Sequence, residues 1–235
     1  MTEQILGIVA VAAPLVQILL MGVIGYPIAK RRPGGMAAFS RSGFTWWIGV
    51  LALISVVALV LMPDTLSWTY PSEHAFSVGR WGFAIGVTLV FCLLVELVGE
   101  RILIGPLHSE RRQRASEKYE GALPTWARSG GAQYGVLSVI AVLEEFVFRA
   151  VALGGLWLAW ELPKFLAAGL VAFAFGMAHW YYGFRQVTIK LIVGSAMVWC
   201  ALSAGWAAAA IAHVLLNIVL TVITNRRHRM AAAAR

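Results

Sequence analysis

The sequence predicts an all-α membrane protein, a polytopic bundle of about seven transmembrane helices. The first observation is composition. Of the 235 residues, 60% are hydrophobic and 13% are charged, whereas soluble domains carry about 25% charged residues. The second is that the apolar residues gather in separate runs of about 20 residues, the length that a helix needs to cross a bilayer. Helices are expected because a segment in lipid must satisfy its own backbone hydrogen bonds.

Each of the apolar runs is expected to form one membrane helix. The runs cover approximately residues 5–29, 44–62, 81–99, 134–158, 164–182, 185–203 and 206–224. Trp46 and Trp47 lie at the start of the second run, and an indole at the end of a membrane segment favours the interface. Cys92 and Cys200 lie inside runs, which predicts two buried thiols and no disulfide.

The basic residues between the runs predict the orientation of the bundle. If every run crosses the membrane, 16 of the 19 Lys and Arg residues lie on one side, and only Arg80 and Lys164 lie on the other. Because cytoplasmic loops carry the excess of positive charge, we expect the N-terminus outside and the C-terminus inside. The net charge of +8 then reflects membrane orientation, and no motif indicates nucleic-acid binding.

Three charged residues interrupt the fourth run, in the stretch EEFVFR. Glu145 precedes Arg149 by one helical turn, the favourable direction for an intrahelical ion pair. Glu144 lies about 100° away around the helix and has no evident partner. A buried carboxylate without a counter-charge suits a proton acceptor. A structural ion pair therefore accounts for Glu145 and Arg149 as well as a functional role does, but not for Glu144.

Two more polar groups lie in later runs. Phe175 and His179 are one turn apart in the fifth run, and His213 and Asn217 are one turn apart in the seventh. Each histidine by itself also fits a structural role, such as an interfacial side chain or a hydrogen bond between helices. Three polar groups in one small bundle favour a common function, because ionisable residues are costly in membrane helices.

The polar residues of these three groups are suited to the hydrolysis of an amide bond by an activated water molecule. Glu144 with His179 can polarise a water molecule, with the carboxylate taking the proton. His213 and Asn217 are neutral donors suited to a developing oxyanion. Neither a GxSxG nucleophile motif nor an HExxH zinc motif is present.

These groups resemble the EExxxR, FxxxH and HxxxN motifs of the CAAX-protease and bacteriocin-processing family of intramembrane proteases, also called the CPBP or ABI family. The resemblance covers about residues 132–224, and the first three runs match only in being hydrophobic. It implies a helical membrane endopeptidase in which Glu144 is the general base, assisted by His179. It further implies that His213 and Asn217 bind the oxyanion, while Glu145 and Arg149 support the site.

The resemblance favours a glutamate mechanism with no cofactor. Zinc is the alternative, because the family is often labelled metallopeptidase and one Glu with two His can bind zinc.

The predicted runs place His179 near the inner face of the membrane, whereas Glu144 lies in the middle of its helix. Either the fifth helix continues past Tyr182 or a cavity opens toward the cytoplasm.

We therefore expect three parts: residues 1–131 with three membrane helices and a basic loop, a catalytic core at 132–225, and a basic cytoplasmic tail at 226–235. The expected partners are the lipid bilayer and a membrane-anchored protein or peptide substrate, in a prokaryotic cytoplasmic membrane. Two alternatives stay open. Buried Glu and His also form proton relays in transporters. A member of the family can also be catalytically inactive and act as an immunity or scaffold protein.

Overall fold

The computed structural model describes residues 1–20, 27–28, 31, 35–62, 77–104, 130–180 and 184–233. Within these ranges the chain is helical and contains no strand, which confirms the predicted all-α class. The elements are α1 (Thr2–Ile18), α3 (Gly35–Leu61), α4 (Val78–Ile104), α6 (Gly130–Glu145), η4 (Phe146–Ala152), η5 (Gly155–Ala159), α7 (Lys164–Met177), α8 (Phe184–Ala204) and α9 (Trp206–Ala233). The stretch from α6 to η5 is nearly continuous and corresponds to the fourth apolar run.

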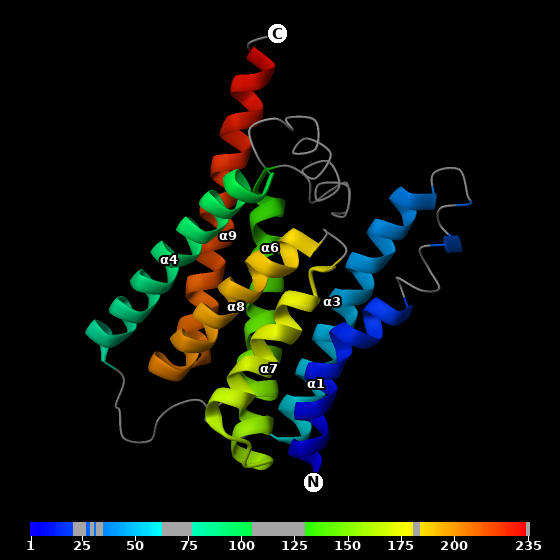
Figure 1. The fold of residues 1–235 in the computed structure, drawn as a ribbon, viewed down its shortest axis with the longest axis vertical. Coiled ribbons are helices and arrows are strands. Elements are labelled where there is room, and N and C mark those ends of the chain that lie inside the picture. Colours follow the sequence, from blue (N-terminus) through cyan, green and yellow to red (C-terminus); the bar gives the residue numbers. More distant parts are fainter. Residues whose placement is uncertain are drawn as a thin grey trace.

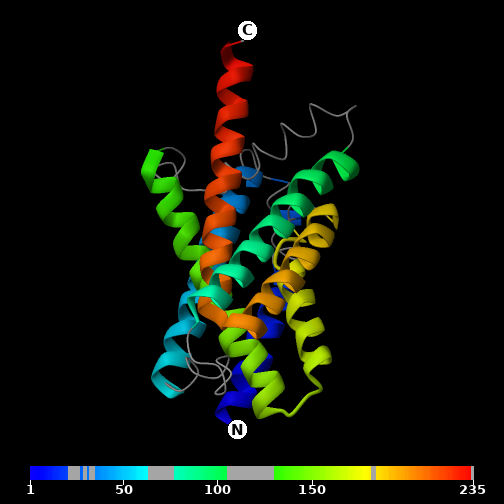
Figure 2. The same cartoon turned by 90° about the vertical axis from the view of Figure 1, so that its left-hand side faces the viewer.

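The helices form one bundle with the two chain ends at opposite ends of its long axis (Figure 1). Helix α6 packs along α9, and α8 packs against both α7 and α4. On the other side, α1 and α3 pack against η4, and α1 also packs against η5 and α7. Figure 2 shows the same bundle from the side, with α9 extending beyond it. The π-helical segment η4 therefore has helices from both halves of the chain around it.

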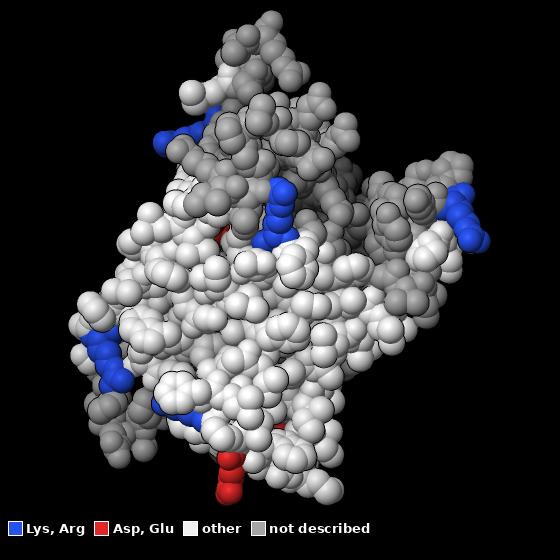
Figure 3. Space-filling model, viewed as in Figure 1, with Lys and Arg blue, Asp and Glu red and all other residues white. Residues whose placement is uncertain are grey.

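The surface of the bundle is that of a membrane protein. Within the described residues, Val78–Gly99, Phe184–Ala204 and Trp206–Arg226 are long and apolar enough to cross a bilayer, and Thr2–Ile18, Thr45–Leu61 and Lys164–Met177 are shorter apolar helices. Large hydrophobic side chains such as Leu53, Val60 and Phe165 are exposed. Figure 3 shows a broad face on which the described surface carries few charged side chains. Such a surface is stable in contact with lipid tails.

Several helix ends differ from the predicted boundaries; α3, for example, begins at Gly35 and not near residue 44. Helix α7 ends at Met177, so the first of the two alternatives given for His179, a fifth helix that continues past Tyr182, is wrong. Helix α9 continues to Ala233, so the predicted basic tail begins inside a helix. Between α8 and α9 the chain turns at Gly205, whose φ of 91° favours glycine.

The fourth stretch changes from α-helix to π-helix immediately after Glu145. π-Helical turns are rare and occur frequently at functional sites. All seven residues of η4 are buried. Further along, a Cβ added to Gly155 would lie 2.8 Å from Gly7 Cα, so α1 and η5 approach each other closely only because both positions are glycine.

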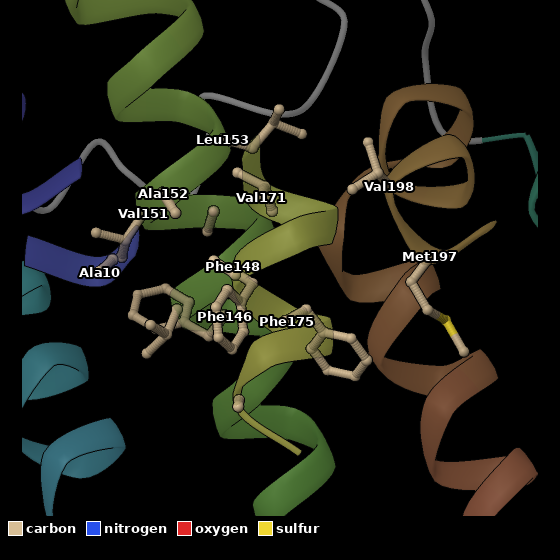
Figure 4. Packing of buried hydrophobic residues seen from close by; sticks show 14 of the residues in the cluster. Ala10, Phe146, Phe148, Val151, Ala152, Leu153, Val171, Phe175, Met197 and Val198 are labelled. Carbon is tan, nitrogen blue, oxygen red and sulfur yellow. The ribbon is translucent and has the colours of Figure 1, made fainter. Parts of the chain in front are cut away.

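Aromatic side chains of η4 and α7 form the centre of the hydrophobic core (Figure 4). The rings of Phe148 and Phe175 meet edge to face with their centroids 5.5 Å apart. Val151 and Ala152 of η4 lie in the same cluster as Ala10 of α1. Cys92 and Cys200 are buried free thiols, as predicted. The core thus surrounds the helix that carries the three charged residues.

Candidate functional site

Glu145 joins two cationic or basic groups in the centre of the bundle. Its Oε2 lies 3.0 Å from Arg149 Nε, and both side chains are completely buried, so the ion pair expected from the one-turn spacing is formed. Its Oε1 lies 2.8 Å from Nδ1 of His213, on α9. The sequence did not indicate this second contact. Glu145 therefore links the fourth stretch to the last helix of the bundle.

Arg149 has further partners on α8 and α7. Its Nη2 donates a hydrogen bond of 3.2 Å to the carbonyl oxygen of Gly194. Its guanidinium carbon lies 4.5 Å from the centroid of the Phe175 ring, a cation–π contact. Because a buried cation is costly without such compensation, these contacts offset part of the cost of an arginine with no exposed surface.

Gly194 permits this arrangement. A Cβ at that position would lie 2.9 Å from Cδ1 of Phe175 and 3.3 Å from the carbonyl oxygen of Ala172. The absence of a side chain lets the Phe175 ring pack against the backbone of α8. It also leaves the Gly194 carbonyl within reach of Arg149. One glycine on α8 thus contributes to both contacts of the buried guanidinium.

Glu144 has different surroundings from Glu145. Its side chain is nearly buried, with a relative exposure of 5%. Its Oε1 accepts a hydrogen bond of 3.1 Å from Nε1 of Trp47, and its Oε2 lies 4.0 Å from Nε2 of His213. The expectation that Glu144 lacks a partner is therefore wrong. Its hydrogen-bond donor is a neutral indole, while the guanidinium of Arg149 is paired with Glu145.

The location predicted for Trp47 from the sequence is wrong. It was expected at the membrane interface, but it is 4% exposed and lies in the core. The neighbouring Trp46 is 55% exposed, so the two indoles of the pair occupy different environments. Nothing in the local sequence distinguishes them, because their separation depends on which side of α3 meets α6 and η4.

The two ring nitrogens of His213 face the two acids. Nδ1 lies 2.8 Å from Oε1 of Glu145, and Nε2 lies 4.0 Å from Oε2 of Glu144. In a neutral imidazole one of these nitrogens is a donor and the other is an acceptor. His213 therefore lies between the two carboxylates, with one ring nitrogen toward each.

His179 lies on the turn that follows α7 and is half-buried. Its Nδ1 lies 3.0 Å from the carbonyl oxygen of Phe175. Because a carbonyl only accepts, Nδ1 carries the hydrogen and Nε2 is the basic nitrogen of the neutral ring. The Phe175 ring lies 5.1 Å from the His179 ring and 5.8 Å from the His213 ring, measured between centroids. The phenylalanine of the FxxxH motif is thus in contact with both histidines.

Asn217 lies one turn beyond His213 on α9. Its Nδ2 donates a hydrogen bond of 3.4 Å to the carbonyl oxygen of Leu137, on α6. This contact joins α9 to α6 one turn after His213 along α9. One of the two amide N–H groups of Asn217 is used in this way.

The zinc alternative requires a cluster of ligands. Catalytic zinc sites commonly use three protein ligands, and among the described residues no group of three or more His, Cys, Asp or Glu side chains is arranged to hold a metal ion. Glu144 and His213 approach to 4.0 Å, but each of them also has another hydrogen-bond partner. The described residues therefore present no three-ligand cluster, and we derive no step through a metal.

Comparison with known proteins finds one family model that matches part of the chain. Residues 132–219 match the model of a protein family described as type II CAAX prenyl endopeptidase Rce1-like. No curated protein and no solved structure matches the chain. The matched residues include the six polar residues predicted for the site, from Glu144 to Asn217, and exclude Trp47.

Proposed function

We propose that this membrane protein is an intramembrane endopeptidase, because residues 132–219 match the model of the Rce1-like family of type II CAAX prenyl endopeptidases. Its substrate is a membrane-anchored or lipid-modified protein or peptide, and its nucleophile is a water molecule activated by Glu144. The family supports a protease and a substrate held at the bilayer. The mechanism rests on the side-chain contacts at the site.

One observation carries the proposal most directly: the two adjacent carboxylates have separate partners. Glu145 is paired with Arg149 and His213, which accounts for its burial. Glu144 accepts one hydrogen bond from a neutral donor, and its other oxygen lies 4.0 Å from Nε2 of His213. A buried carboxylate that is held by a neutral donor is suited to accept a proton during a reaction.

In the proposed reaction, a proton passes from water to Glu144 as the water oxygen bonds to the scissile carbonyl carbon. The carbonyl oxygen becomes an oxyanion. When the C–N bond breaks, Glu144 returns the proton to the leaving amine nitrogen. The basic Nε2 of His179 provides a second acceptor that orients the attacking water. No other nucleophile is needed, and the products are a carboxylic acid and an amine, which then exchange a proton to give a carboxylate and an ammonium group.

His213 is the first donor that we propose for the oxyanion, through Nε2, the ring nitrogen on the side of Glu144. Its other ring nitrogen, Nδ1, lies 2.8 Å from Oε1 of Glu145, which holds the ring in this orientation. The second amide N–H of Asn217 is a further donor. Arg149 holds Glu145 in place from the opposite side.

The transporter alternative has one observation in its favour. A second, partly buried pair, Glu96 with Lys190, joins α4 to α8, with Nζ and Oε1 2.5 Å apart. Buried ionisable groups of this kind also occur in proton relays. Ion flux in liposomes, measured with a pH-sensitive dye and with no peptide cleavage, would support transport over proteolysis.

The experiment that tests the proposal uses the protein reconstituted in liposomes. A farnesylated peptide ending in Cys-aliphatic-aliphatic-X, with a fluorophore and a quencher on either side of the bond after Cys, is the probe. We expect cleavage by the wild type, and loss of at least about a hundredfold in rate for Glu144→Gln, the scale of a general base. Glu3→Gln, the same change at an exposed position of α1, is the control. Unimpaired cleavage by Glu144→Gln would contradict the mechanism.

A further inference from the structure

We infer that Trp47, on α3 and outside the matched family segment, is a positioning residue that orients the carboxylate of Glu144. This inference rests on the proposed function of Glu144, and it assigns part of the active site to the N-terminal half of the chain. The two residues are 97 positions apart in the sequence.

The contact between them is specific in its chemistry. The indole Nε1–H is a donor only, and it lies 3.1 Å from Oε1 of Glu144. The other carboxylate oxygen, Oε2, is the one that faces His213. The indole therefore gives the two oxygens different environments: Oε1 is held, and Oε2 points into the site. We assign proton transfer to Oε2 for this reason.

The indole is itself held firmly. Trp47, Leu51, Ile54 and Ala58 recur at helical spacing along α3, and all four are buried. The Trp47 ring also lies 6.2 Å from the ring of Phe148 on η4. Because the donor is fixed by the core on both sides, it can hold a carboxylate in one orientation, as positioned catalytic groups require.

A purely structural role for Trp47 makes a different prediction. If the side chain only fills the core, another aromatic side chain of similar shape suffices and the N–H group is unimportant.

Two substitutions distinguish a positioning role of Trp47 from a purely structural one. Trp47→Phe keeps an aromatic ring but removes the donor. Replacement of Trp47 by 3-benzothienylalanine keeps the size and shape of the indole and replaces only N–H by sulfur. Trp46→Phe, at the exposed neighbour, is the matched control.

The first measurement is independent of activity. In protein labelled with 15N in the tryptophan indoles, the resonance that disappears in Trp47→Phe identifies Trp47. We expect Glu144→Ala to move that resonance upfield in the proton dimension, because the hydrogen bond to the carboxylate is lost. Glu3→Ala should leave it in place. An unchanged Trp47 resonance in Glu144→Ala would overturn the contact, and with it the inference.

The second measurement separates kcat from KM with the farnesylated peptide. We expect both Trp47 replacements to lower kcat about tenfold, the scale of one hydrogen bond to a charged group, with KM changed less than twofold. Trp46→Phe should retain the wild-type kcat. Wild-type kcat in the benzothienylalanine protein would overturn the inference, even if Trp47→Phe failed to fold. A different result would show that the proposed function of Glu144 is wrong although the contact with Trp47 exists. In that case Glu144→Gln would cleave the peptide at the wild-type rate, while the Trp47 resonance would still move in Glu144→Ala.

Discussion

Glu145 Oε1 lies 2.8 Å from Nδ1 of His213. The second acid of the EEFVFR stretch therefore does more than pair with Arg149: it also contacts a histidine 68 residues later in the chain. In the proposed mechanism the two neighbouring acids have different functions. Glu145 organises the site, and Glu144 takes part in proton transfer.

Substitution of Glu145 should act mainly on stability. Glu145→Gln leaves the fully buried Arg149 without a counter-charge, and breaking a buried pair in this way costs about 3–5 kcal/mol. We expect a large fall in the midpoint of thermal unfolding in detergent, followed by intrinsic tryptophan fluorescence. The exposed change Glu3→Gln should leave the midpoint unchanged. A Glu145→Gln protein as stable as the wild type would show that the pair does not hold the site together.

Gly194 should not tolerate a methyl group. In Gly194→Ala the new Cβ lies 2.9 Å from Phe175 Cδ1, so the ring must move, and overpacking of this kind costs about 1–3 kcal/mol. Gly169→Ala on α7 is the control, because a Cβ there meets nothing within 4 Å. The midpoints of thermal unfolding of the two variants should therefore differ. Equal stability would mean that the Phe175 ring can shift at no cost.

The Glu96–Lys190 pair should show strong coupling in a double-mutant cycle. Both side chains are largely buried, so removal of either one leaves an uncompensated charge, whereas removal of both does not. We expect Glu96→Gln and Lys190→Met each to lower the free energy of unfolding by about 2 kcal/mol, and the double variant to lose less than the sum. Additive losses, measured by denaturant unfolding in micelles, would indicate that the pair is not coupled.

His213 and Asn217 should contribute unequally to the rate. Nε2 of His213 faces Glu144, whereas the amide of Asn217 already donates to the carbonyl of Leu137. We therefore expect His213→Ala to lower kcat for the farnesylated peptide by about a hundredfold or more, the scale of an oxyanion donor. Asn217→Ala should lower kcat less and should also lower the unfolding midpoint. The reverse order of the two effects on kcat would assign the oxyanion to Asn217.

The features that follow from local spacing could be predicted from the sequence. The Glu145–Arg149 pair lies within one helical turn, so periodicity alone identifies it. The existence of the helices and the burial of Cys92 and Cys200 also follow from the apolar runs. These predictions need no knowledge of which helix is next to which.

The contacts between helices could not be predicted in this way. Trp47 meets Glu144 and His213 meets Glu145 only because α3 and α9 pack against the fourth stretch. An apolar run on α3 gives no sign of which indole faces inward, since lipid and core are both apolar environments. The π-helical turns after Glu145 likewise have no marker in the sequence. The end of α7 was placed too late because the residues after Met177 are also largely apolar.

The different roles proposed for the two acids, proton transfer for Glu144 and support of the site for Glu145, are tested most directly by comparing Glu144→Gln with Glu145→Gln in parallel. The rate of cleavage of the farnesylated peptide and the unfolding midpoint are measured for each. We predict that Glu144→Gln loses cleavage but unfolds within a few degrees of the wild type, whereas Glu145→Gln unfolds at a much lower temperature. Wild-type cleavage by a stably folded Glu144→Gln protein would contradict the account.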